Sequence, residues 1–123
     1  MPSNAFSGKS PLASQVFDWS KLAVERTPVG ERRPLFDSPT QTFANLECHA
    51  TTLDARQVSH EPHRHPDEEL VFVKEGVLDV MINGHHRLAT AGSVVFFASN
   101  DFHGLKNGAE ERVTYYVLRI AVG

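Results

Sequence analysis

The part of the chain that follows Pro66 contains no proline, and it alternates short apolar runs with turn residues. Asn83-Gly84 lies between two such runs. This dipeptide favours a type I′ hairpin turn, because both positions must accept a positive φ. Proline removes a ladder hydrogen bond, so its absence over this length is expected where strands pair on both edges. Short strands separated by frequent turns predict an all-β sandwich or barrel.

The apolar runs and turn residues place the strands of this barrel. We expect strands over 42–53, 69–75, 77–82, 85–88, 93–98, 102–106 and 112–122, and 93–98 should be a buried apolar strand. Residues 42–53 alternate, with Leu46, Cys48 and Ala50 on one face and Glu47, His49 and Thr51 on the other. If the polar face lines the interior, His49 contacts a substrate or orients a metal ligand; if it faces outward, His49 has neither role.

The first forty residues differ from the rest of the chain in composition and in the pattern of apolar residues. Residues 1–14 are rich in Ser, Pro and Gly and predict a flexible segment. Residues 15–25 fit neither a helix nor a strand period, and Trp19 within them should dock on the chain's own barrel or on a partner subunit. Prolines and a glycine mark 26–41 as a loop or edge segment. The chain therefore divides into an N-terminal arm and edge segment, 1–41, and a barrel, 42–123.

Length and composition exclude several classes of protein. With 123 residues, of which 41% are hydrophobic, the chain can build one core but not two. The net charge of -3 argues against binding to nucleic acid. No apolar run reaches the length of a transmembrane helix, and residues 1–20 lack the apolar core of a signal peptide. We therefore expect no membrane association and a cytoplasmic location, although a precursor that has lost its leader would have the same sequence.

The stretch from His60 to Gly76 carries a candidate metal site. His63, His65 and Glu69 share odd numbering, and in an extended chain His63 and His65 point to the same face. His103 lies far along the chain and would join them by folding. Imidazoles with one carboxylate suit a divalent transition ion, namely Fe, Mn, Ni, Zn or Cu. The single cysteine, Cys48, excludes a cysteine-based site.

Two spacings in the chain resemble the motifs of the cupin superfamily. His63-x-His65-x3-Glu69-x6-Gly76 is similar to its first motif, and Gly92-x5-Ala98-x-Asn100-x2-His103-x3-Asn107 is similar to its second. The family's usual glycine at the start of the first motif is replaced by Gln57, and its usual proline and glycine in the second by Ala98 and Asn100. Asn accepts a left-handed backbone, so Asn100 suits a turn position.

The resemblance covers about residues 42–122 and implies a single-domain cupin of type 2, a jelly-roll barrel with an N-terminal arm. It also implies one divalent metal held by His63, His65, Glu69 and His103, and a homodimer whose N-terminal segments exchange. We expect Glu69, Val71 and Val73 to point inward together. The substrate pocket is then expected to involve the following residues: His49, Val71, Val73, Met81, and Phe96 or Phe97.

The same site predicts the kind of function. A metal ion with open positions favours a small metal-dependent enzyme that acts on a small, largely apolar organic molecule with one or two oxygen donors. A dioxygenase is favoured over an isomerase or a hydrolase. The alternative is a non-catalytic cupin that binds or senses a small molecule, because the same fold hosts both kinds of protein. An ordinary surface position is favoured for His60, with the rim of the site as the alternative, and His85 and His86 are expected on the surface.

Overall fold

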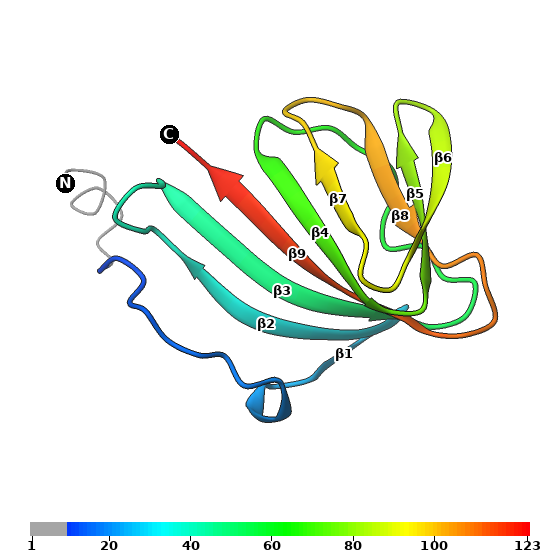
Figure 1. Ribbon diagram of the computed structural model, residues 1–123, viewed down its shortest axis with the longest axis horizontal. Helices are drawn as coiled ribbons and strands as arrows, with labels where there is room; N and C mark the ends of the chain where they lie inside the picture. Colours follow the sequence, from blue (N-terminus) through cyan, green and yellow to red (C-terminus); the bar gives the residue numbers. More distant parts are fainter. Residues whose placement is uncertain (1–9) are drawn as a thin grey trace.

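The computed structural model describes residues 10–123, which form an all-β structure without an α-helix. Two antiparallel sheets face one another (Figure 1). The larger has the order β1-β2-β3-β9-β4-β7, and the smaller has the order β6-β5-β8. The elements are η1 (Trp19–Lys21), β1 (Glu25–Thr27), β2 (Gly30–Ser38), β3 (Asn45–Leu53), β4 (Glu68–Glu75), β5 (Val77–Ile82), β6 (His85–Thr90), β7 (Val94–Phe97), β8 (His103–Lys106) and β9 (Val113–Ala121).

Alternation along the strands explains why the two sheets enclose a core. One side chain in two along β4, β5 and β9 points between the sheets, as the period of a strand requires. The core receives buried residues from both sheets. They are Leu53, Val71, Val73, Leu78, Val80, Phe97, Leu105, Val113, Tyr115 and Val117. The predicted sandwich or barrel is therefore confirmed, and its interior is apolar at the centre.

The predicted turns have the expected backbone geometry. Asn83 and Gly84 both have positive φ, 48° and 89°, and join β5 to β6. Asn100 has φ 65°, the left-handed conformation that its place in the second motif requires. The expectation of a buried strand over 93–98 is wrong for one face of β7. Val94 and Phe96 are 59% and 52% exposed because β7 is an edge strand whose outer face has no covering layer.

The N-terminal arm is more ordered than a loop. Residues 30–38 form β2, which pairs with β3 along its whole length, and a register shift follows Pro34. This proline is tolerated in the strand because the irregularity lies next to it. The flexible segment expected over 1–14 falls for the most part on residues 1–9, outside the described residues.

Trp19 docks on the outer face of the chain's own large sheet. Its ring meets Tyr116 edge-on at 5.8 Å between centroids. The cationic groups of Arg33 and Lys74 each lie 4.5 Å from its centre. The ring of Phe17 packs on Phe36 of β2 in a tilted arrangement, with 5.2 Å between centroids. Of the two predicted docking partners, the structure therefore shows the chain's own barrel.

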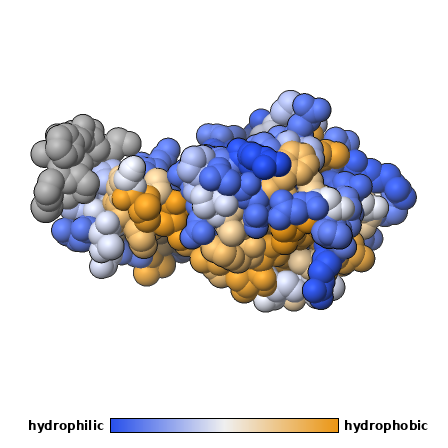
Figure 2. Space-filling view, turned by 90° about the horizontal axis from the view of Figure 1, so that it is seen from above, coloured by the Kyte–Doolittle hydropathy of each residue, from blue (hydrophilic) through white to orange (hydrophobic). Residues whose placement is uncertain are grey.

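Apolar side chains remain on the surface elsewhere, as Figure 2 shows for one side of the molecule. The large exposed ones include Phe72, Leu88, Val94 and Phe96. Within residues 10–123, no helix has the length and apolar character needed to cross a membrane.

Candidate metal centre

His63, His65, Glu69 and His103 meet at one point inside the barrel. One ligand atom from each lies within 4.8 Å of those of the other three. The backbone brings the distant pair together, because His63 and His103 exchange both N–H···O hydrogen bonds, at 3.0 and 2.9 Å, in an isolated bridge. Glu69 is the second residue of β4, and its inward orientation leaves it 8% exposed. Folding thus joins the two sequence motifs.

The hydrogen bonds around two of the histidines fix which ring nitrogen is available. Nδ1 of His65 lies 2.9 Å from the carbonyl oxygen of Asp67, and Nδ1 of His103 lies 2.9 Å from that of Asp101. A carbonyl only accepts, so each Nδ1 carries the proton and each Nε2 carries a lone pair. Backbone acceptors of this kind orient imidazoles that ligate metals.

Both lone pairs point at a carboxylate oxygen. Nε2 of His65 is 2.7 Å and Nε2 of His103 is 3.1 Å from the same atom, Oε1 of Glu69. Three acceptors at these distances repel one another unless a cation or a proton lies among them. A divalent ion satisfies all of them together, so the donor set fits one transition metal.

The remaining ligand candidate is also suited to bind as a neutral ring. Burial lowers the pKa of His63 below its ordinary value, and the neighbouring histidines 60, 103 and 65 lower it further, whereas Glu69 raises it. His60 stacks on the ring of His63 at 4.4 Å between centroids, which places it at the rim, the less favoured of its two expected positions. A low pKa favours the unprotonated imidazole that a metal ion requires.

Packing and ion pairing hold the cluster in place. The ring of Phe97 stacks on that of His103, with centroids 4.2 Å apart and planes inclined by 15°. Arg119 donates from Nε to the carboxylate of Asp67 at 3.0 Å, and Asp67 is the residue whose carbonyl orients His65. These contacts limit the movement of two ligands and keep their donor atoms directed at the same point.

A cavity of about 260 Å³ opens beside the cluster. Most residues of its wall have polar side chains, and they include residues of β2, β3 and β9 that do not belong to the metal cluster. They are Arg32, Glu47, His49, Thr51, Tyr115, Val117 and Arg119. The polar face of β3 therefore lines the interior, which settles the orientation that alternation alone left open for His49. Burial raises the pKa of Tyr115 to about 12, so its hydroxyl stays protonated in the neutral range.

The expected apolar wall is only partly present. Val71 and Val73 point inward with Glu69, but both belong to the core cluster beneath the cavity and do not line it. Phe97 does not line the cavity either, and its ring covers that of His103. Phe96 points to the opposite face of β7 and is half exposed, as the alternation of the strand requires.

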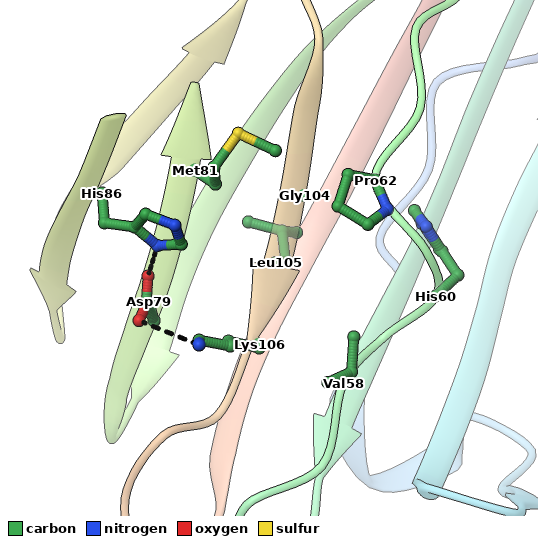
Figure 3. A pocket seen from close by; sticks show the side chains of 9 residues that line it. All are labelled: Val58, His60, Pro62, Asp79, Met81, His86, Gly104, Leu105 and Lys106. Carbon is green, nitrogen blue, oxygen red and sulfur yellow. Dashed lines mark hydrogen bonds and ion pairs between the residues drawn. The ribbon is translucent and has the colours of Figure 1, made fainter. Parts of the chain in front are cut away.

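The placement of Met81 in the metal pocket is wrong. Leu78 and Val80 of β5 fill the core, so Met81 takes the outer face of the small sheet. There it lines a separate hollow of about 250 Å³ (Figure 3). In this hollow Asp79 binds His86 at 2.9 Å and lies 3.9 Å from the Lys106 ammonium. The parity of β5 separates Met81 from Leu78 and Val80, but parity alone does not say which of the two faces is turned to the core.

The sequence did not single out Arg32, Glu47 or Tyr115 for this cavity. Glu47 and Thr51 share the parity of His49, which was the available signal. The prolines around Arg32 predict a loop or edge segment. Its position in the cavity depends on the pairing of β2 with β3, in which Arg32 lies opposite Thr51.

The comparisons with known proteins agree with this architecture. The Cupin_2 model of the cupin domain matches residues 50–119. The chain belongs to the Cupin_2 family. Among curated proteins, none matches this cupin significantly.

Solved structures of similar cupins show the same fold. An RmlC-like cupin from Shewanella frigidimarina is 17% identical, with 89% of this chain and 93% of that chain covered and a TM-score of 0.72. The polyketide cyclase RemF from Streptomyces resistomycificus is 16% identical, with 88% and 80% covered and a TM-score of 0.71. A Cupin_2 domain of an XRE family transcriptional regulator from Enterobacter cloacae is 25% identical, with 72% and 92% covered and a TM-score of 0.62.

Proposed function

We propose that this cupin is a small metal-dependent enzyme that acts on a small organic molecule, with a dioxygenase favoured over an isomerase or a hydrolase. The observation that carries the proposal is that three of the four ligand candidates, His63, Glu69 and His103, lie in the wall of a cavity. A closed structural site would be shielded by packed side chains on all sides. Four protein ligands leave two positions of a six-coordinate ion open, and these are available to substrate and to dioxygen or water.

The size and charge of the cavity support a small substrate. Its volume, about 260 Å³, lies below the usual range of sites for drug-sized ligands. Arg32 and Arg119 in the wall are balanced by Glu47 and Glu69, so a divalent ion adds a positive charge that no side chain of the wall compensates. This favours a small molecule whose oxygen donors carry, or acquire, negative charge.

When bound, the metal supplies a Lewis acid and, if it is a redox ion, a site for activation of dioxygen. The chain's own residues hold and orient the ligands, and Phe97 excludes water from one side of His103. The hydroxyl of Tyr115 is a fixed donor in the cavity wall. A non-catalytic binding cupin is the second candidate, because similar cupin structures include both an enzyme and a regulator domain.

The test begins with metal analysis of protein purified without chelator or added metal. Oxygen uptake is then measured for Fe(II)-loaded protein with catechols, flavonols, thiols and β-diketones. The matched variants are His103→Ala, which removes a ligand, and His85→Ala, which removes an exposed histidine of β6. We expect uptake that is lost in the first variant and kept in the second. Tight binding of these compounds without turnover for any metal would favour the binding function.

A further inference from the structure

The wall of the metal cavity contains an imidazole that is held by a carboxylate and directed to the interior. Nδ1 of His49 lies 2.8 Å from Oε2 of Glu47, on the same face of β3. Both residues line the cavity that contains the metal cluster, and the side chain of His49 is 19% exposed. Neither residue belongs to the cluster itself.

The contact with Glu47 decides the tautomer of His49. A carboxylate accepts and does not donate, so in the neutral ring Nδ1 of His49 carries the proton and Nε2 carries the lone pair. No group within residues 10–123 forms a hydrogen bond with this Nε2. His49 therefore presents a free proton acceptor to a polar cavity, and nothing in the described protein satisfies it.

Glu47 is itself fixed from the other side. Nη2 of Arg32 lies 3.4 Å from the same Oε2, and another nitrogen of Arg32 lies 3.6 Å from Glu25. The chain of contacts from Arg32 through Glu47 holds the imidazole in one orientation. A fixed carboxylate also stabilises the imidazolium that forms when His49 takes up a proton.

The register of the large sheet sets the separation between this pair and the metal cluster. Glu47 is the partner of Arg119 on β9, and Arg119 is the partner of Glu69 on β4. Neighbouring strands lie nearly 5 Å apart, so the backbones of Glu47 and Glu69 are separated by about 10 Å. Both side chains lie on the inner face of the large sheet with Arg119 between them, and the cavity that they line, about 260 Å³, has room for one small molecule.

We propose that His49, positioned by Glu47, accepts the proton that a substrate loses when it binds in the metal cavity. This inference rests on the proposed function and adds a substrate class, a small molecule with an ionisable O–H next to a second oxygen donor. The O–H bond breaks and its electron pair stays on the substrate oxygen. The proton forms the N–H bond at Nε2, and it later returns to the product or passes to solvent.

Other titratable and charged groups face His49 from every element around the cavity. They are Arg32 from β2, Glu47 from β3, Arg119 and Tyr115 from β9, Glu69 from β4, His103 from β8, and His60 and His63 from the preceding loop. The metal-ligating histidines are not available as bases when an ion occupies their lone pairs. Tyr115 stays protonated, since burial raises its pKa to about 12. Of the two remaining imidazoles, His49 is held by a carboxylate, whereas His60 is held only by the carbonyl oxygen of Glu61.

The test counts protons on binding and does not depend on turnover. The full chain is loaded with Zn²⁺, which is not redox-active, and titrated with maltol, a neutral hydroxypyranone with one ionisable O–H beside a carbonyl. Calorimetry in two buffers of different ionisation enthalpy gives the number of protons released to solvent for each ligand bound. The variants are His49→Gln, Glu47→Gln and, as a matched control, His85→Gln on β6.

We expect few protons to be released by the wild-type protein and by His85→Gln. His49→Gln should release about one more proton per ligand, because maltol then loses its proton to the buffer. Proton release by Glu47→Gln should lie between these two values. If circular dichroism and zinc content are unchanged in this variant, a purely structural role for Glu47 would not produce such a difference. A variant that loses its fold is replaced by His49→Asn.

The possible failures have different meanings. Equal proton release by wild type and both cavity variants would overturn the role of His49 while leaving the metal function intact. Absence of any maltol binding to zinc-loaded wild-type protein would overturn the proposed function, because the ion would then have no accessible position, and the inference would fall with it.

Discussion

Replacement of Glu69 by Gln separates the role of the carboxylate as a metal ligand from its role in the fold. Oε1 of Glu69 lies 2.7 and 3.1 Å from the lone-pair nitrogens of His65 and His103. In the metal-free protein with neutral histidines these acceptors oppose one another, and the amide group of Gln would donate to them. We therefore expect the free energy of unfolding of the metal-free Glu69→Gln protein to stay within about 1 kcal/mol of wild type.

The metal-bound protein should respond differently. At a free metal concentration one hundred times the dissociation constant, binding stabilises the wild-type fold by about 2.7 kcal/mol. If loss of the anionic ligand weakens binding about a hundredfold, the same concentration stabilises the variant by only about 0.4 kcal/mol. For a domain of this size the difference corresponds to roughly 9 °C in the metal-induced rise of Tm.

The assay is differential scanning calorimetry with and without Zn²⁺ or Mn²⁺, supported by metal analysis after dialysis. The matched control is Glu68→Gln, because Glu68 is the preceding residue and its side chain is exposed. Its metal-induced rise in Tm should equal that of wild type. An equal rise for Glu69→Gln, or a loss in Glu68→Gln, would refute the assignment of the ligand.

Four further predictions concern the fold and the assembly. Val73→Asp should cost more than about 4 kcal/mol of unfolding free energy, because it buries a charge at a position that is 3% exposed. Lys74→Asp, on the outer face of the same strand, should cost about 1 kcal/mol or less, and urea titration compares the two variants. Asn107→Ala should cost about 2–4 kcal/mol in the same assay. The amide nitrogen of Asn107 lies within hydrogen-bond distance of three carbonyl oxygens, and its amide oxygen accepts from one backbone N–H. A loss of stability below the error of the titration would contradict this prediction. Burial, with a smaller contribution from the neighbouring glutamate, raises the pKa of Cys48 to about 11, so iodoacetamide at neutral pH should modify the native thiol far more slowly than the unfolded one, and equal rates would argue against its burial. We also propose a homodimer, supported by the exposed apolar side chains of the large sheet. Sedimentation velocity at micromolar concentration should show the dimer, and deletion of residues 1–25 should weaken it. A wild-type protein that sediments as a monomer would exclude it.

The local features of this cupin follow from its sequence. The Asn83-Gly84 turn, the alternation of β3 and the common orientation of Glu69, Val71 and Val73 depend only on backbone preference and the two-residue period of a strand. These properties are local, so a single sequence contains them. The spacing of the two motifs likewise predicted which four residues would meet, since it matched a known family.

The tertiary structure decided everything that depends on which strands are neighbours. Alternation divided β3 into two faces, but only the pairing of β3 with β9, and of β9 with β4, showed that the face with Glu47 and His49 belongs to the interior. Met81 was misplaced for a related reason: its parity was known, but the side of the small sheet that faces the core was not.

The contact between Arg32 and Glu47 in the cavity wall also depends on strand pairing. Arg32 lies fifteen residues before Glu47, yet the two side chains interact because β2 pairs with β3 around the irregularity at Pro34. Sequence by itself determined the metal-ligand candidates and the barrel, because these are encoded in short-range patterns. The proton-accepting pair and the charges around it arose only from long-range strand register, which no short pattern specifies.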